Sequence, residues 1–308
     1  MNYIIGIDGG GTKTHSYTAD ENLTILHEFT AGPSTFLLLG EQTVSETIKK
    51  HLDSAVAALN CSYSDISAVH LGTTGAGRKT DAERFEKAFA KYIEEMGLPK
   101  IPLYVESDAR IALEGAFSGK PGSILIAGTG SIMFGKNASG EIFRVGGFGR
   151  FIGDEGSGYM IGKKGLTAVA REFDGRGVHT LISEKLKAGT EIVDGPSLIT
   201  AVYTNNYDIA SAARFVIDAA SEGDEIAVNI LNEECNNLID HIRTMKEKIN
   251  EPTLLLSFIG GTIANDTFYS AMLKEKIIQV VPGVSVLPQE NNPTMGALIM
   301  AKQRISKQ

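Results

Sequence analysis

Hydrophobic and polar positions in the first 118 residues follow a strand pattern that changes to a helical one and back again. Short apolar runs bounded by turn residues are typical of strands, and apolar residues repeated every three to four positions are typical of helices. The expected strands are 3–8, 14–19, 24–29, 68–71 and 102–105, and the expected helices are 42–59, 80–96 and 108–117. Three strands therefore precede an alternation of helix and strand, which predicts an α/β fold.

The same pattern begins again at Lys120-Pro121-Gly122. An apolar run, a glycine-threonine turn and two more strands follow, so we interpret the halves as two copies of one supersecondary unit. The expected strands here are 123–127, 132–135, 141–145, 253–259 and 285–287, and the expected helices are 219–248, 264–280 and 293–304. We expect two lobes, which are 1–118, with the closing segment 293–308 packed back on it, and 119–292, with a helical insertion at about 157–250.

Composition restricts the classes of protein that fit. Of the 308 residues, 43% are hydrophobic and 21% are charged, as in an ordinary globular protein, and the formal net charge of −8 disfavours nucleic acid as a partner. Cys61 and Cys235 are far apart, which disfavours a disulfide framework, a zinc site or an iron–sulfur cluster within one chain. An apolar run of about 18 residues and a signal-peptide pattern are both absent, so we expect a cytoplasmic protein with no membrane partner.

The turn between the first two expected strands reads Asp8-Gly9-Gly10-Gly11-Thr12-Lys13-Thr14. Glycine permits positive φ and close approach of the backbone to a ligand, and successive N–H groups in such a turn bind anions. The threonine hydroxyls and Lys13 add donors, and Asp8 is placed to hold Mg²⁺ through water. A tight hairpin also uses glycine, but three adjacent glycines exceed what a hairpin requires. The turn therefore predicts a phosphate site, and the spacing is not that of a Walker loop.

Two further glycine turns follow strands. Gly128-Thr129-Gly130-Ser131 repeats the first turn in the second half, so a triphosphate held from both sides is expected. Gly260-Gly261-Thr262 would let an adenine or ribose lie against the backbone. By itself each turn also fits a plain connection between elements. The residues expected to bind the nucleotide triphosphate are Gly10, Gly11, Thr12, Lys13, Thr14, Gly128, Thr129, Gly130, Gly260, Gly261 and Ala264.

Acidic residues that follow two of the expected strands are candidates to bind and activate the molecule that accepts a phosphoryl group from the triphosphate. Asp108 begins a helix, where an Asp alone is best explained as a helix cap, but it lies at the same expected sheet edge as Asp8. A carboxylate there is placed to act as a general base toward a sugar hydroxyl. The glycine-rich segment 146–158 offers Phe148 for stacking on a sugar face and Asp154 for its hydroxyls, although a flexible loop is the alternative. The segment 73–78 is expected to border the same site.

Together these motifs resemble the actin, heat-shock ATPase and sugar-kinase superfamily. Residues 4–14 are similar to its first phosphate motif, 124–131 to the second and 258–265 to the adenosine motif. Gly146-Gly147-Phe148 and Gly153-Asp154-Glu155-Gly156-Ser157 are similar to the N-acetylglucosamine kinase branch. The resemblance implies two ribonuclease-H-like lobes in an actin-like ATPase fold, a cleft between them for ATP and sugar, Mg²⁺, and transfer to the 6-hydroxyl of an amino sugar. A homodimer is also compatible with the family.

The resemblance also assigns site residues. It places Asp108 at the family's catalytic base. The expected sugar-binding residues are Ser34, Phe36, Gly75, Asp108, Ser131, Gly146, Gly147, Phe148 and Asp154. Family members often have asparagine where Phe36 stands and tryptophan where Phe148 stands, so the identity of the sugar is open. We hypothesise that N-acetylmuramic acid is accepted as well as N-acetylglucosamine, with Arg78 or Arg150 pairing its lactyl carboxylate.

A second class of function fits the same fold. The superfamily includes activator-type ATPases and non-catalytic regulators that bind ATP and change conformation without transferring phosphate. The activators share an iron–sulfur cluster through cysteines, and this chain has no suitable cysteine pattern. Asp108 and the acids of the 146–158 segment favour the kinase, because a switch needs neither a base nor a sugar pocket.

Overall fold

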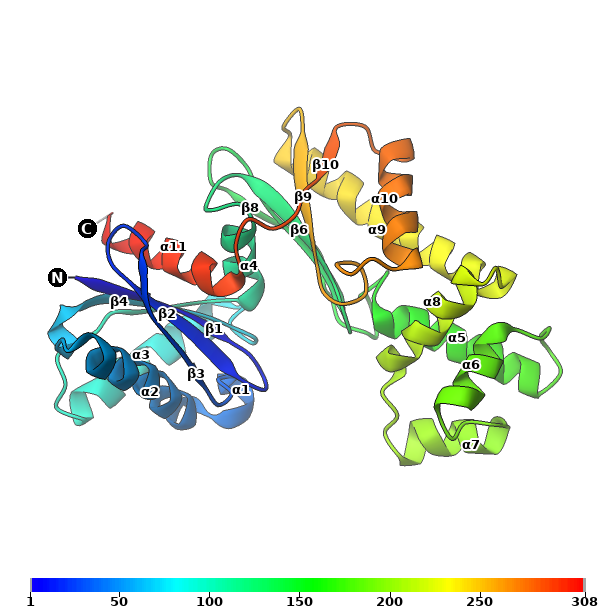
Figure 1. The fold of residues 1–308 in the computed structure, drawn as a ribbon, viewed down its shortest axis with the longest axis horizontal. Coiled ribbons are helices and arrows are strands. Elements are labelled where there is room, and N and C mark those ends of the chain that lie inside the picture. The colour runs from blue at the N-terminus through cyan, green and yellow to red at the C-terminus, as the bar shows by residue number, and fades with distance from the viewer. Residues whose placement is uncertain (1, 307–308) are drawn as a thin grey trace. The chain divides into compact units, whose positions relative to one another are not determined.

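The computed structural model describes residues 2–306. The chain forms two compact units, of which unit 1 is Met1–Pro121 with Pro288–Gln308 and unit 2 is Gly122–Leu287. Each unit has its own mixed sheet and its own hydrophobic core. The two units are coloured blue to cyan with red, and green to orange, in Figure 1.

The sheet of unit 1 has five strands in the order β3-β2-β1-β4-β5. Its strands are β1 Tyr3–Gly9, β2 Thr14–Ala19, β3 Ile25–Ala31, β4 Ile66–Thr73 and β5 Leu103–Glu106. The first three strands are antiparallel neighbours, and β1, β4 and β5 run parallel. Because Gly9 pairs with Thr73 and Gly72 pairs with Glu106, the carboxyl ends of the three parallel strands meet at one edge.

Helices cover both faces of this sheet. They are α1 Phe36–Leu39, α2 Glu41–Leu59, the 3₁₀ turn η1 Tyr63–Asp65, α3 Lys79–Glu95, α4 Asp108–Ala116 and α11 Pro293–Ile305. Figure 1 shows α2 and α3 on one side of the strands and α4 with α11 on the other. Phe85 and Phe89 of α3 and Leu52 of α2 are fully buried against the sheet, so the apolar stripe of each helix forms the core. The C-terminal α11 lies against β1 and α4.

Unit 2 repeats the strand arrangement of unit 1. Its strands are β6 Gly122–Ala127, β7 Ser131–Lys136, β8 Ile142–Gly146, β9 Leu254–Ile259 and β10 Val284–Val286. Their order, β10-β9-β6-β7-β8, and their directions correspond strand by strand to those of unit 1. The internal repeat expected from the two glycine-threonine turns is therefore present in the fold.

The remainder of unit 2 is helical. Its helices are α5 Gly158–Phe173, α6 Leu181–Gly189, α7 Gly195–Ile199, the π-turn η2 Thr200–Thr204, the 3₁₀ turn η3 Ile209–Ala212, α8 Ala213–Ser221, α9 Glu225–Ile249 and α10 Phe268–Val280. The long α9 packs on β7 and β8 and against α5, α8 and α10. Its buried face, including Leu231, Leu238 and Ile242, is central to the core of this unit.

Two helix boundaries differ from the sequence expectation because of local capping. The helix expected at 264–280 begins at Phe268, since Thr267 and Ser270 form a reciprocal capping box. The helix expected at 219–248 is divided, because Asp224 accepts a hydrogen bond from the amide of Ala227 and starts a new helix. Within residues 2–306, no helix combines the length and the apolar character needed to cross a membrane.

Candidate functional site

The first glycine turn connects β1 to β2 in unit 1. The Gly10 amide donates to the Lys13 carbonyl at 3.0 Å, and the Ser34 amide donates to the Gly10 carbonyl at 3.1 Å, so the turn is fixed at both ends. None of the glycines at 9–11 has positive φ, so a left-handed backbone is not the reason for glycine here. At Gly9 the requirement is close approach instead, because a Cβ there would lie 2.2 Å from Ser34 Oγ.

Three buried hydroxyl groups surround this turn. Thr14, Ser34 and Thr35 are each at most 6% exposed, and their hydroxyl oxygens have no hydrogen-bond partner among residues 2–306. A buried hydroxyl without a partner is unfavourable, and a polar ligand that supplies one removes the penalty. Thr14 and Ser34 were expected in the site from the sequence, and Thr35 is an addition that their shared geometry indicates.

The carboxylates of Asp8 and Asp108 act on each other electrostatically. The pKa of Asp8 is raised above its usual value, first by burial and then by the negative charge of Asp108, while His15 and Lys13 partly oppose the rise. Two carboxylates that repel each other at a strand edge form a setting that a divalent cation stabilises. Asp8 therefore fits the expected role in holding Mg²⁺.

The side chains available for a metal are few. No group of three or more His, Cys, Asp or Glu residues in the described chain gathers closely enough to hold a metal ion alone. A magnesium ion at Asp8 would take its other ligands from phosphates and water, as such ions commonly do.

Asp108 is exposed at the start of α4, and its carboxylate is held on two sides. Thr74 Oγ1 donates to Oδ2 at 2.9 Å, and the Ala109 amide donates to Oδ1 at 2.8 Å. The helix cap is Ser107, whose side chain accepts from the Arg110 amide at 3.2 Å. The interpretation of Asp108 as a simple cap is therefore wrong, and its carboxylate is both exposed and oriented.

The other expected sugar-binding residues of unit 1 differ in exposure. The ring of Phe36 is 2% exposed and stacks on Phe85 at 4.9 Å between centroids, so it belongs to the core. A contact between the Phe36 side chain and a sugar stays a prediction. Gly75 has φ +96°, and a Cβ there would lie 2.8 Å from Leu37 of the short helix α1. Leu37 therefore packs over the 74–75 turn that holds Asp108.

In unit 2 the second glycine turn is bonded to the start of α5. The Gly128 carbonyl accepts from the Gly158 amide at 2.8 Å, and the Thr129 carbonyl accepts from the Tyr159 amide at 3.2 Å. Like the first turn, it has no positive φ. A Cβ at Gly128 would meet nothing within 4 Å, so the surface beside it is open. Glycine at this position is therefore not required to avoid a clash within the protein, and it leaves room for a ligand.

The third glycine turn lies beside the second. A Cβ at Gly260 would lie 2.4 Å from the Ala127 carbonyl oxygen, and its φ is +95°. The Thr262 amide donates to that same carbonyl at 3.2 Å. Gly260 thus permits the two turns to touch. Gly261 and Ala264 are exposed on the same turn, where a ligand can reach them.

The segment 146–157, which we call the sugar loop, closes over the second turn within unit 2. Asp154 has φ +60°, its Oδ1 accepts from the Gly149 amide at 3.2 Å, and its Oδ2 lies 2.8 Å from the position of a Cβ at Gly130. Ser131 Oγ donates to the Glu155 carbonyl at 2.5 Å. The structure therefore brings Ser131, Gly130 and Asp154 together, and their contact with a sugar stays a prediction.

The first half of the sugar loop is open and carries exposed aromatic rings. Gly146 and Gly147 have φ +71° and +73°, and Arg144 donates to both of their carbonyls. Phe148 is 68% exposed, with the Arg144 guanidinium 5.6 Å from its ring centroid. An exposed ring in this turn is available for stacking on the apolar face of a sugar.

Sequence reasoning did not single out Glu234, His241 and Tyr269. All three are buried or half-buried against the sugar loop from α9 and α10, and two of them hydrogen-bond to Gly156. One sequence feature indicates Glu234, because it is an acid on the apolar face of α9 beside Leu231 and Cys235. The histidine alone carried no such pattern.

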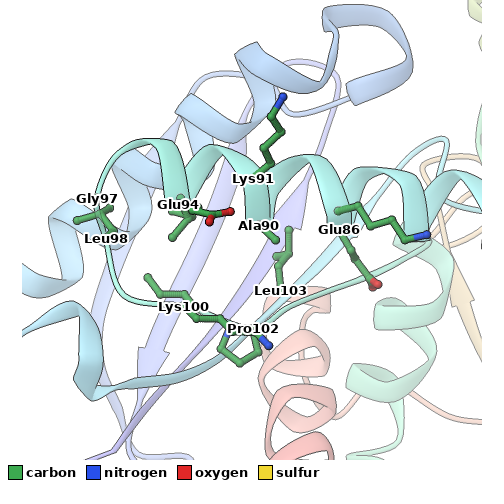
Figure 2. A pocket seen from close by; sticks show the side chains of 12 residues that line it. Glu86, Ala90, Lys91, Glu94, Gly97, Leu98, Lys100, Pro102 and Leu103 are labelled. Carbon is green, nitrogen blue, oxygen red and sulfur yellow. The ribbon is translucent and has the colours of Figure 1, made fainter.

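A separate cavity of about 930 Å³ lies in unit 1, where α3 ends and β5 begins. Figure 2 shows Lys91, Glu94, Lys100 and Leu103 around it. None of the expected site residues is among those that line this cavity, so it is distinct from the strand edge that carries Asp8 and Asp108.

Comparisons with known proteins agree with this arrangement. A family model described as the BadF/BadG/BcrA/BcrD ATPase family matches residues 5–301. An N-acetylmuramic acid/N-acetylglucosamine kinase of Clostridium acetobutylicum is 32% identical over 98% of this chain and 99% of the relative. An N-acetyl-D-glucosamine kinase of Dictyostelium discoideum is 30% identical over 97% of both chains.

A solved structure shows the same fold. It is a proposed N-acetylglucosamine kinase from Chromobacterium violaceum, which superposes with a TM-score of 0.72 at 23% identity and covers 98% of this chain and 99% of its own. The predicted two-lobed sugar-kinase fold and the resemblance to the N-acetylglucosamine kinase branch are both confirmed. The chain therefore belongs to the BadF/BadG/BcrA/BcrD ATPase family.

Proposed function

We propose that this protein is an ATP-dependent kinase that phosphorylates the 6-hydroxyl of an N-acetylated amino sugar, N-acetylglucosamine or N-acetylmuramic acid. The observation that carries the proposal is the Asp108 carboxylate, held by Thr74 and the Ala109 amide at the strand edge that also bears Asp8. The two near full-length relatives are named as amino-sugar kinases, and the matching family model is described as an ATPase family, which supports an ATP-dependent sugar kinase.

Asp108 is the general base in this proposal. Its free carboxylate lone pairs accept the proton of the sugar hydroxyl while that oxygen attacks the γ-phosphorus and the bond to the leaving ADP oxygen breaks. Thr74 and Ala109 fix the carboxylate in one orientation, so little reorganisation is needed as the proton moves.

The phosphates of ATP are proposed to bind the two glycine-threonine turns through backbone N–H groups and threonine hydroxyls. Thr14, which has an unpartnered buried hydroxyl, and the open surface beside Gly128 support this assignment. Lys13 adds positive charge in the first turn. Asp8 would hold Mg²⁺ through water, and that ion would neutralise part of the phosphate charge. Gly260, Gly261 and Ala264 are proposed to lie along the adenosine.

The sugar is proposed to bind Asp154 and Ser131 through its hydroxyl and acetamido groups, with Phe148 against its apolar face. Asp154 retains an acceptor position beside Gly130, which supports the first contact. Ser34 is a further proposed sugar ligand, because its buried hydroxyl lacks a partner among residues 2–306.

The decisive experiment measures ATP consumption with a panel of amino sugars and their 3-O-lactyl ethers, followed by NMR of the product. We expect turnover of N-acetylglucosamine or N-acetylmuramic acid and a phosphate on the 6-oxygen. ATP hydrolysis that no sugar stimulates would overturn the proposal.

ATP hydrolysis without stimulation by a sugar would favour the alternative, an activator-type or regulatory ATP-binding protein. The description of the matching family as an ATPase family is compatible with that alternative. The cysteines do not support an activator that shares an iron–sulfur cluster. Cys235 is fully buried, and burial raises its pKa to about 12, so it offers no exposed thiolate.

A further inference from the structure

The sugar loop ends at a peptide group that is clamped from both sides. The Gly156 amide donates to Glu234 Oε2 at 2.5 Å, and the Tyr269 hydroxyl donates to the Gly156 carbonyl at 3.1 Å. Glu234 and Tyr269 are both 0% exposed. Gly156 has φ +77°, and a Cβ there would lie 2.2 Å from Leu238 Cγ, so the loop reaches this clamp only with glycine.

A carboxylate at this depth needs a counter-charge. Lys164 of α5 supplies it, with its Nζ 2.5 Å from Glu234 Oε1 and 2.7 Å from an oxygen of the exposed Glu233. The contact to Glu234 is an ion pair without hydrogen-bond alignment, because Oε1 has no well-oriented donor among residues 2–306. An apolar side chain of similar volume would fill this position at a lower desolvation cost. The particular contribution of Glu234 is therefore its bond to the loop.

The same face of α9 reaches the beginning of the loop. His241 lies seven positions after Glu234, and Leu238 lies between them, so all three project from one side of the helix. A Cβ at Gly146 would lie 2.9 Å from His241 Cε1, and His241 Nε2 lies 3.7 Å from Glu155 Oε2. One rigid helix thus contacts the loop near both of its ends.

The clamped residues adjoin the groups that face the sugar. Glu155, directly before Gly156, accepts from Ser131 through its carbonyl, and Asp154 precedes it with a left-handed backbone. A shift of the Gly156 peptide would therefore move Asp154, whose position beside Gly130 depends on the backbone of residues 154–156.

We propose that Glu234 and Tyr269 are positioning residues that hold the sugar loop, and through it Asp154, in the geometry that binds the sugar. This inference rests on the proposed function of the loop. It assigns the loop's order to a buried carboxylate on α9, with Lys164 as its counter-charge, and assigns no catalytic contact to either residue.

The kinetic test compares Glu234→Gln with Glu233→Gln. The two residues are sequence neighbours and share Lys164, but only Glu234 touches the loop. We expect Glu234→Gln to raise the KM for the sugar about tenfold to a hundredfold, with a smaller change in the KM for ATP, because misplacing a binding group by about 1 Å has effects of this size. Glu233→Gln should keep wild-type constants.

A second variant protects the test against misfolding. Tyr269→Phe removes only the hydroxyl that bonds Gly156, and it should raise the sugar KM in the same direction while leaving the melting temperature of the protein near that of the wild type. Equal sugar KM values for Tyr269→Phe, Glu234→Gln and the wild type would overturn the proposal.

A readout independent of turnover separates this inference from the proposed function. Arg150 is exposed in the sugar loop, so trypsin cleavage after Arg150, followed by mass spectrometry, reports the order of the loop. Glu234→Gln should be cleaved about tenfold faster than Glu233→Gln. The protease cuts the open state of the loop, and a loop that has lost its anchor is open in a larger fraction of the molecules. Equal cleavage overturns the inference even if the kinase assay succeeds. If no sugar is phosphorylated, the proposed function fails and the cleavage contrast alone decides the role of Glu234.

Discussion

Thr74 Oγ1 donates a hydrogen bond to Asp108 Oδ2 at 2.9 Å, which ties the end of β4 to the start of α4. The two residues are 34 positions apart in the chain, and they meet because β4 and β5 are parallel neighbours that end at one edge. This hydrogen bond uses one lone pair of Asp108 Oδ2. Because the carboxylate is planar, the bond also fixes the position of Oδ1. An acid held in this way is suited to accept a proton from a bound hydroxyl group.

Asp108→Asn should reduce kcat roughly 10²–10⁴-fold, the range expected when a general base is removed. The amide keeps the size of the side chain, so the KM for the sugar and the melting temperature should change little. A coupled assay of ADP release measures the effect. Unchanged phosphoryl transfer by this variant would show that Asp108 is not the base.

Thr74→Val provides a graded companion to that variant. It removes the hydroxyl and leaves the carboxylate, so kcat should fall by about tenfold or less, in proportion to one hydrogen bond of about 0.5–1.5 kcal/mol. A loss from Thr74→Val as large as that from Asp108→Asn would contradict the assigned order of importance.

The glycines of the two turns in unit 2 should respond differently to alanine. Gly260→Ala places a methyl group 2.4 Å from the Ala127 carbonyl at φ +95°, so it should destabilise unit 2 by roughly 1–3 kcal/mol or more. Gly128→Ala meets nothing within 4 Å, so it should leave the free energy of unfolding nearly unchanged while raising the KM for ATP.

Urea denaturation and the KM for ATP, measured on both variants, separate the two roles. Gly128→Ala with normal ATP kinetics would remove the second turn from the phosphate site. Gly260→Ala with unchanged stability would mean that the two turns do not need to touch.

The sequence predicts the succession of strands along the chain well, because each strand and the glycine-threonine turn after it are specified by neighbouring residues. The run 14–19 coincides with β2, and the first strand and its acid were found from one buried apolar stretch. The edge that Asp8 and Asp108 share was also predictable, since parallel strands that precede helices end at the same side of a sheet. These features depend on residues close together in the chain.

Other features depend on contacts that the sequence does not display. The sequence leaves a cap of α4 open as the alternative role of Asp108. The structure gives the cap to Ser107 and pairs Asp108 with Thr74, and a pattern of residues cannot decide this because both Ser and Asp are good caps. The burial of Phe36 against Phe85 joins segments 49 positions apart. The clamp at Gly156 likewise requires α9 and α10 to be packed before it exists.

Asp8→Asn should stabilise the protein while it weakens catalysis. Burial and the charge of Asp108 raise the Asp8 pKa, so the ionised carboxylate costs folding free energy at pH 7 when no cation is present. We expect a higher melting temperature for Asp8→Asn than for wild type in EDTA, and a larger rise on addition of MgCl₂ in the wild type than in the variant. Calorimetry in both buffers measures this. An equal response of both proteins to MgCl₂ would exclude Asp8 from the metal site.

His70 should make unit 1 sensitive to acid. Its side chain is 0% exposed, both ring nitrogens lack partners among residues 2–306, and burial lowers its pKa from 6.5 to about 3. The folded-state pKa lies below the unfolded one, so the stabilisation is complete above the unfolded pKa and is lost as the pH falls from there toward about 3.

His70→Phe removes this titration and keeps a ring that can stack near Tyr104. Between about pH 7.5 and pH 5, the free energy of unfolding should fall about 2 kcal/mol less in the variant than in the wild type. Urea titrations at the two pH values check the difference. The same dependence in both proteins would mean that His70 gains a proton in the folded state.

Of Arg78 and Arg150, Arg150 is the better candidate to pair with the lactyl carboxylate of N-acetylmuramic acid. It lies in the sugar loop with its guanidinium 5.1 Å from the Phe151 ring and 5.6 Å from the Tyr159 ring, and no ion pair holds it within residues 2–306. Arg144, which also lies near the loop, is already engaged with the carbonyls of Gly146 and Gly147.

Arg150→Met should raise the KM for N-acetylmuramic acid about tenfold to a hundredfold, because a hydrogen bond to a charged group contributes a binding free energy of this size. The KM for N-acetylglucosamine should stay unchanged. Arg78→Met is the matched control, because Arg78 is equally exposed but lies at the start of α3 in unit 1. The KM of each variant is measured for both sugars. An equal rise for the two sugars in Arg150→Met would mean that Arg150 shapes the loop and binds no carboxylate. An effect of Arg78→Met alone would move the carboxylate site to unit 1, and failure of the wild type to phosphorylate N-acetylmuramic acid would end the hypothesis.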